Sequence, residues 1–119
     1  MKHILLLEDD QSILDLLSAL LEEGGYYVSC ATRISYAKEV LDRVAVDLLI
    51  ADILLPDGTA FALIDEAKKR NISYLLMTGS WPHMAELKAN GEFHLSKPFK
   101  LSELSAEVTR RIGPGETLN

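Results

Sequence analysis

The sequence predicts an α/β fold, in which a five-stranded, doubly wound parallel sheet carries helices on both faces. Five apolar runs of strand length alternate with amphipathic stretches of helix length along the 119 residues, and this alternation is typical of parallel strands joined by right-handed crossovers. The third run, at residues 46–51, is almost continuously hydrophobic, as expected for a strand with both faces covered. A chain of this length can form one domain with one core.

The predicted elements follow one another in a regular order. Strands are expected at the apolar runs, which are residues 4–7, 26–31, 46–51, 72–77 and 92–96. Helices are expected where apolar residues recur at helical spacing, over residues 11–23, 59–70, 81–89 and 101–112. Another helix should follow an N-cap at Thr32 and bury Val44 on its inner face. Pro56-Asp57-Gly58 is a predicted turn, and the helix at 81–89 is short.

The composition favours a single globular domain over residues 1–119, with a flexible tail at 113–119. The net charge is −6 and no basic stripe is visible, which argues against nucleic-acid binding. The apolar runs are too short to span a bilayer, and the N-terminus lacks the pattern of a signal peptide. The single cysteine, Cys30, requires no oxidising compartment. We therefore expect a cytoplasmic location and no membrane partner.

Charged and hydroxyl side chains gather where the predicted strands end. These residues are Glu8, Asp9 and Asp10 after the first strand, Asp52 after the third, Thr78 after the fourth and Lys97 after the fifth. Ligands of such sheets bind at the carboxyl ends of the strands. Neighbouring carboxylates repel one another unless a cation lies between them, so the pattern indicates a divalent metal, with an anion bound beside the lysine. Each residue taken alone is more simply explained as a helix cap, a turn residue or a solvated charge. Those explanations do not account for all of them gathering at the same ends of the strands.

With these motifs in this order, the chain resembles the receiver domain of two-component response regulators. The motifs are Leu5-Leu6-Leu7-Glu8-Asp9-Asp10, the run from Asp47 to Gly58, Thr78 and Lys97-Pro98-Phe99. The resemblance covers nearly the whole chain and implies a flavodoxin-like strand order, 2-1-3-4-5. It also implies a function in phosphorelay signal transduction, in which a histidine kinase or phosphotransfer protein phosphorylates the domain and so switches its protein–protein contacts.

The resemblance assigns roles at the metal and the phosphoacceptor. Asp52 would be the phosphoacceptor, since a carboxylate can act as a nucleophile. Mg²⁺, with Mn²⁺ as an alternative, would be held by Glu8, Asp9, Asp52 and the backbone carbonyl of Leu54, an oxygen set that suits this ion. Asp10 would instead start the first helix, where its charge suits the helix dipole.

The resemblance also assigns the residues that sense the phosphoryl group. Lys97 and Thr78 would contact its oxygens, and the Lys97-Pro98 peptide bond should be cis. Receivers usually pair the threonine with an aromatic residue three positions before the lysine, where this chain has His94. Thr78 and His94 are therefore the candidate switch residues. The stretch between Thr78 and Lys97 is short by about one helical turn, which resembles the "FAT GUY" receivers, so movement of residues 80–90 as a unit is the competing switch.

Two other functions compete with that of a phosphorylated receiver. A pseudo-receiver would bind partners without phosphorylation, but the acidic residues, Thr78 and Lys97 all suit phosphorylation. A haloacid-dehalogenase-like phosphatase is suggested by Asp57-Gly58-Thr59, yet that loop requires aspartate where this chain has Leu55. We therefore expect no enzyme beyond self-catalysed phosphorylation and dephosphorylation. We expect no DNA-binding or catalytic output domain after the last helix, so output should pass to an unknown downstream protein by direct contact.

Overall fold

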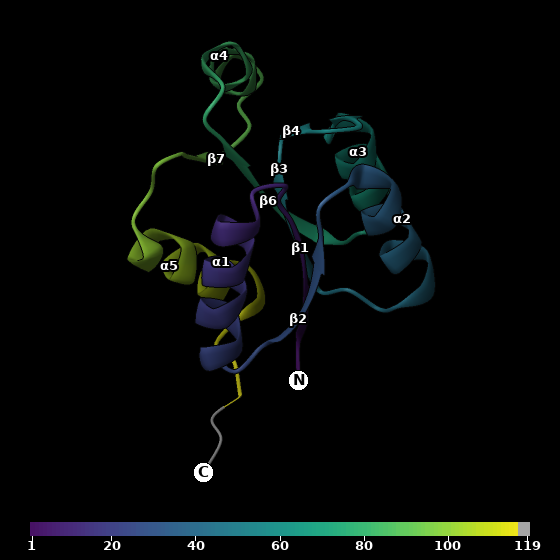
Figure 1. Cartoon of the computed structure of the whole chain (residues 1–119), viewed down its shortest axis with the longest axis vertical. Coiled ribbons are helices and arrows are strands. Elements are labelled where there is room, and N and C mark those ends of the chain that lie inside the picture. The colour runs from purple at the N-terminus through teal and green to yellow at the C-terminus, as the bar shows by residue number, and fades with distance from the viewer. Residues whose placement is uncertain (117–119) are drawn as a thin grey trace.

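A five-stranded parallel sheet runs through the middle of the protein and carries helices on both faces (Figure 1). The computed structural model describes residues 1–116. The strands lie in the order β2-β1-β3-β6-β7, which is the predicted order 2-1-3-4-5 once a small hairpin is set aside. Their bounds are β1 His3–Leu7, β2 Tyr27–Ala31, β3 Leu48–Asp52, β6 Ser73–Thr78 and β7 His94–Ser96. The hairpin is formed by β4 Leu54–Leu55 and β5 Gly58–Thr59.

Five helices connect and follow these strands. They are α1 Gln11–Glu23, α2 Ile34–Arg43, α3 Phe61–Lys69, α4 Trp81–Ala89 and α5 Leu101–Ile112. In Figure 1, α1 and α5 cover one face of the sheet, α2 and α3 cover the other, and α4 stands beyond β7. Within residues 1–116, no helix is long and apolar enough to cross a membrane.

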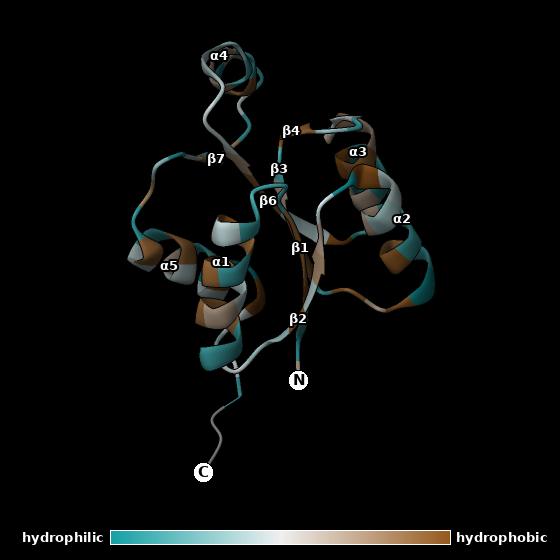
Figure 2. Ribbon diagram, viewed as in Figure 1, coloured by the Kyte–Doolittle hydropathy of each residue, from teal (hydrophilic) through white to brown (hydrophobic). Residues whose placement is uncertain are grey.

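The core has two halves, because successive side chains of a strand point to opposite faces of the sheet. Ile4 and Leu6 of β1 pack with the inner side chains of α1 and α5, while Leu5 and Leu7 pack with those of α2 and α3. Figure 2 shows the consequence, since the central strands are mostly hydrophobic and the helices alternate between hydrophobic and hydrophilic residues. The nearly continuous apolar runs of the sequence are thus explained by burial on both faces.

Three of the predicted helices have the expected bounds, which are those at 11–23, 81–89 and 101–112. The prediction for the second helix is wrong at both ends. Thr32 is not its N-cap, because the helix starts one residue later, with Arg33 in the N-cap position. Val44 is not on its inner face either: the backbone turns extended there, and the side chain is 44% exposed. The third helix begins at Phe61 rather than Thr59, because Thr59 belongs to the hairpin.

Other local expectations are confirmed. Pro56 and Asp57 form the tip of the β4–β5 hairpin, where Leu55 pairs with Gly58. The Lys97-Pro98 peptide bond is cis.

The residues that follow α5 run back across the turn between α1 and β2. The Tyr26 hydroxyl donates to the Gly113 carbonyl at 2.6 Å, and the Glu116 N–H donates to the Gly25 carbonyl at 3.1 Å. Two backbones cross so closely here that a Cβ added at Gly115 would overlap the backbone of Gly24. The last residues of the predicted flexible tail, 117–119, lie outside the described residues.

Candidate functional site

The register of the sheet brings four strand ends to one edge. Leu7 lies opposite Ala51, Asp52 lies opposite Met77, and Thr78 lies opposite Ser96. The residues that end or follow these strands therefore share the carboxyl edge, where doubly wound folds bind ligands. The sequence analysis predicts the candidate site at this same edge.

An acidic cluster forms the centre of this edge. One carboxylate oxygen from each of Glu8, Asp9 and Asp52 lies within 4.8 Å of the others. Glu8 and Asp52 are buried, whereas Asp9 is exposed. Like charges at this separation destabilise one another unless a cation compensates them.

Lys97 supplies a cation to this cluster. Its ammonium group bonds with Glu8 and, at 2.8 Å, with Oδ2 of Asp52. Burial raises the pKa of Glu8 above its ordinary value of 4.5, although the hydrogen bond from Lys97 opposes the rise. Burial would lower the pKa of Lys97, but its hydrogen bonds to Asp52 and Glu8 outweigh burial and raise it. The lysine therefore stays charged across the physiological range.

The donor set suits a hard divalent cation. Three carboxylates supply oxygen ligands, and the exposure of Asp9 leaves one side open to water, which Mg²⁺ retains when it binds proteins. Leu54 starts the hairpin two residues after Asp52. The residue between them, Ile53, is fixed by a hydrogen bond from its N–H to the Met77 carbonyl at 3.1 Å. Glu8, Asp9 and Asp52, with the Leu54 carbonyl, are the residues that would hold the ion.

Thr78 is buried at the end of β6, and its hydroxyl is already engaged. Oγ1 accepts a hydrogen bond from the Ser80 N–H at 3.0 Å. Ser80 is the N-cap residue of α4. The threonine therefore links the acidic edge of the sheet to the start of the fourth helix.

His94 lies elsewhere, at the start of β7 and opposite Leu76. Its Nε2 is 3.2 Å from the Ser96 hydroxyl. The ring lines a groove of about 510 Å³ between β7 and α4, which Trp81, Met84 and Phe93 also line. The two candidate switch residues are thus on neighbouring strands, but only Thr78 is at the acidic edge.

The third acid of the first motif behaves as a helix cap. Oδ1 of Asp10 accepts from the Ile13 N–H at 3.2 Å and so caps α1, as expected. Sequence reasoning missed a second cap: the carboxylate of Asp57 accepts from the N–H groups of Ile34 and Ser35, at 2.9 and 3.1 Å. The only sequence signal was an aspartate in a turn, and nothing in its spacing identified its partner.

An apolar groove of about 370 Å³ lies beside Lys97, on the α1 face of the sheet. It is lined by Ile13, Leu16, Leu17, Lys97, Pro98, Phe99 and Leu101. Leu16 is 54% exposed, an unusual position for a leucine in the middle of an amphipathic helix. The leucine-rich stripe of α1 would be expected to lie in the core, and this residue is an exception to it.

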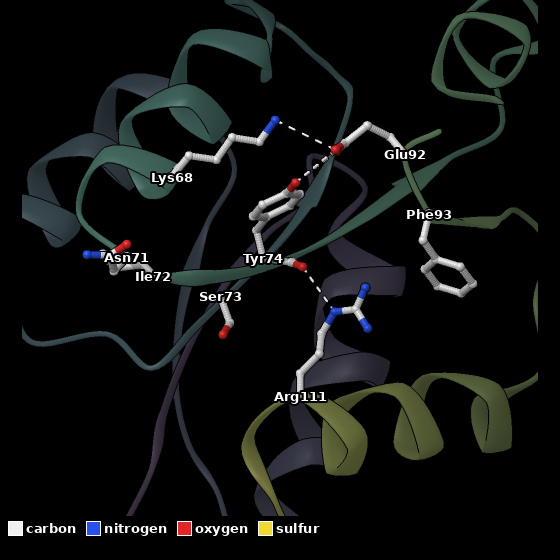
Figure 3. A pocket seen from close by; sticks show the side chains of 8 residues that line it. All are labelled: Lys68, Asn71, Ile72, Ser73, Tyr74, Glu92, Phe93 and Arg111. Carbon is white, nitrogen blue, oxygen red and sulfur yellow. Dashed lines mark hydrogen bonds and ion pairs between the residues drawn. The ribbon is translucent and has the colours of Figure 1, made fainter. Parts of the chain in front are cut away.

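A more polar pocket of about 500 Å³ lies near the opposite, amino-terminal end of β6 (Figure 3). Figure 3 shows Lys68 and Tyr74 directed toward Glu92, with the Tyr74 hydroxyl 3.0 Å from its carboxylate and the Lys68 ammonium 3.6 Å away. Arg111 donates to the Tyr74 carbonyl at 3.0 Å. The pocket lies between α3, β6, the segment before β7 and α5. Its polar groups pair with one another, so within residues 1–116 it leaves no unpaired cation for a ligand.

Comparisons with known proteins agree with this geometry. The model of the response regulator receiver domain matches residues 4–109. The transcriptional regulatory protein VxrB of Vibrio cholerae is 34% identical over 113 residues, which are 92% of this chain and 45% of that protein. The chain thus spans about half the length of the curated relatives it matches.

Solved structures show the same fold. The non-phosphorylated HemR receiver domain of Leptospira biflexa is 30% identical, covers 100% of both chains and has a TM-score of 0.80. The response regulator TrrA of Thermotoga maritima, in complex with Mg²⁺-BeF, is 27% identical with a TM-score of 0.81. That alignment covers 92% of this chain and 98% of TrrA. Neither the pseudo-receiver nor the phosphatase alternative is favoured by these matches.

Replacing Lys97 should show how much this lysine stabilises the fold by neutralising the acidic cluster. In Lys97→Met, we expect the free energy of unfolding to fall by about 1–3 kcal/mol near neutral pH, since Glu8 and Asp52 lose their cation. The loss should be smaller than for a fully buried pair, because 20% of the Lys97 side chain is exposed. Urea denaturation measures it, with Lys69→Met on the exposed face of α3 as the control.

The pH dependence of this loss gives a second check. Without Lys97, the pKa of Glu8 should rise further, so the folded state binds a proton that the unfolded state has released. The stability deficit should therefore grow as the pH rises from about 4 to about 8. An equal deficit at both pH values would show that Lys97 does not compensate the buried carboxylate.

Proposed function

The chain belongs to the response regulator receiver domain family, and we propose that Asp52 accepts its phosphoryl group. Aspartate phosphorylation is the general function of this family, and a two-component receiver implies a histidine kinase partner. One observation supports the assignment to Asp52: this buried carboxylate ends β3 beside Glu8 and Asp9 and bonds with the Lys97 ammonium. In this arrangement its oxygen can attack phosphorus while the bond to the donor nitrogen of a phosphohistidine breaks.

The surrounding side chains would act mainly by placing charge, since phosphoryl transfer needs little covalent help from the protein. Mg²⁺, or Mn²⁺ in its place, would neutralise negative charge on the phosphoryl oxygens when bound. Lys97 already bonds with Asp52, so a small rotation of its ammonium would let it donate to a phosphoryl oxygen. The Thr78 hydroxyl would donate to another.

The domain is a signalling component rather than a classical enzyme, and its own catalysis would be limited to gaining and losing the phosphoryl group. We propose that residues 1–119 form a single receiver domain. Cytoplasm is its proposed location, which suits the single cysteine, Cys30. The proposed likeness to the "FAT GUY" subgroup stays a prediction.

The phosphodonor is proposed to dock on the apolar groove beside Lys97. Lys97 and Pro98 line this groove, while the lysine ammonium bonds with Asp52. A protein that covers the groove is therefore adjacent to the phosphoacceptor. The exposed Leu16 side chain offers the apolar anchor that such a contact needs.

The switch is proposed to run through Thr78 to α4. If the threonine hydroxyl moves toward a phosphoryl oxygen, its hydrogen bond from the Ser80 N–H must lengthen or break. The helix is weakly held, since Leu87 is the one fully buried residue among those that the structure describes in α4. Trp81, 79% exposed at its first position, would move with it. An unknown downstream protein would read the altered surface of α4 and β7.

Asp52→Asn tests the phosphoacceptor. The substitution keeps the shape of the side chain but removes the nucleophile, so incubation with a small phosphodonor and Mg²⁺ should add no phosphate to the intact mass. Asp10→Asn is the matched control, because Asp10 caps α1, and it should still be phosphorylated. A stable adduct on the Asp52→Asn protein, mapped to Asp9 or Asp10, would overturn the assignment.

Leu16→Ser separates docking from chemistry. Transfer from a phosphorylated protein donor should slow by about fivefold or more, the effect of losing one interface anchor, whereas phosphorylation by a small phosphodonor should not change. Tyr36→Ser is the control, since Tyr36 is 53% exposed but lies on α2. Equal rates for Leu16→Ser and wild type with the protein donor would rule out this groove as the docking surface.

Hydrogen exchange distinguishes the two candidate switches. On phosphorylation, amide exchange in residues 80–90 should change in the wild-type protein and in His94→Ala, but not in Thr78→Ala, because the threonine transmits the signal. Thr78→Ser keeps the hydroxyl and should restore the response. A response that is lost in His94→Ala and kept in Thr78→Ala would assign the signal to the histidine ring.

A further inference from the structure

The N-terminus of α2 is capped by a residue that is distant in the sequence, Asp57. Its N-cap residue, Arg33, makes no side-chain cap hydrogen bond within the described part of the chain. Instead, Oδ1 of Asp57 accepts from the Ile34 N–H at 2.9 Å and Oδ2 accepts from the Ser35 N–H at 3.1 Å. A carboxylate at a helix N-terminus also complements the helix dipole. Hydrogen bonding from Ile34 lowers the pKa of Asp57, so the cap is charged near neutral pH.

The residue that provides this cap sits at the tip of the hairpin next to the phosphoacceptor. Asp57 lies between Leu55 and Gly58, which pair with each other, and Leu54 pairs with Thr59 behind them. Gly58 has φ of 134°, a conformation that side-chain-bearing residues rarely adopt, and a Cβ added there would meet only Cδ1 of Ile34, at an ordinary contact distance of 3.9 Å. The hairpin tip thus faces the start of α2 and is joined to it by the hydrogen bonds of Asp57.

The base of the same hairpin is fixed to the sheet. The Ile53 N–H donates to the Met77 carbonyl at 3.1 Å, and the Ala60 N–H donates to the Ile53 carbonyl at 2.9 Å. Leu54 therefore lies in a short loop that is tied at its base to β6 and at its tip to α2. If the hydrogen bonds between Asp57 and α2 are lost, the hairpin is held only by its own two residue pairs and by the bonds at its base.

We propose that Asp57 is a positioning residue for the phosphorylation site. By anchoring the hairpin tip on α2, it holds the backbone of Leu54 where its carbonyl completes the cation site with Glu8, Asp9 and Asp52. This inference rests on the proposed function, because Leu54 is a ligand only if the acidic cluster binds Mg²⁺. Coupling is reciprocal, so binding of the cation should in turn strengthen the cap of α2.

Mg²⁺ titration followed by tryptophan fluorescence or NMR tests the proposal without any phosphodonor. Asp57→Ala should bind Mg²⁺ about tenfold more weakly, the usual effect of losing a group that orients a ligand. Asp57→Asn keeps one acceptor oxygen and should lie between Asp57→Ala and wild type. Glu39→Gly is the matched control: Glu39 is exposed on α2, and glycine there weakens the helix without touching the hairpin.

Hydrogen exchange provides the reciprocal measurement. Mg²⁺ should slow exchange of the Ile34 and Ser35 amides in the wild-type protein but not in Asp57→Ala. If wild type and Asp57→Ala bind Mg²⁺ equally while these amides exchange faster in the variant, Asp57 only caps α2 and the proposal is wrong. If the wild-type protein binds no Mg²⁺, the proposed cation site fails and this inference fails with it.

Discussion

Charge balance at the carboxyl edge of the sheet is the constraint on which the rest of the structure depends. Two neighbouring strands, β1 and β3, deliver Glu8 and Asp52 to the same buried place, where an uncompensated carboxylate is strongly disfavoured. Lys97 arrives from beyond β7 and bonds with both. The parallel register cannot form without bringing these groups together, so the lysine contributes to the stability of the fold as well as to the charge of the candidate site.

The proposed docking surface and the proposed conformational response lie on different sides of the phosphoacceptor. The apolar groove that contains Leu16 lies with α1 on one face, where a phosphodonor would dock. On the other side of Asp52, two side chains connect the edge to helix N-termini: Thr78 binds the N–H of Ser80 before α4, and Asp57 binds the first N–H groups of α2. Donor contact and conformational response therefore do not compete for the same surface.

The sequence was most informative where burial and strand order decide the outcome. Alternating apolar runs predicted the sheet, and the acidic and lysine residues at their ends predicted the edge where they gather. Contacts that join distant segments could not be predicted in this way. Thr32 looked like a local cap for α2, but Asp57, more than twenty residues away, performs that role. Leu16 belongs to a run of leucines on α1, yet its side chain stays 54% exposed and lines a groove beside Lys97.

The close crossing of Gly24 and Gly115 has a consequence for how this domain can evolve. A methyl group at position 115 would overlap the Gly24 backbone. Replacement of this glycine by any other residue therefore requires the segment after α5 to move away from the turn between α1 and β2. Both glycines lie far from the acidic edge, near the turn between α1 and β2. Among homologues that keep this crossing, invariance at position 115 would record a steric limit on the backbone, and it should not be read as a mark of signalling function.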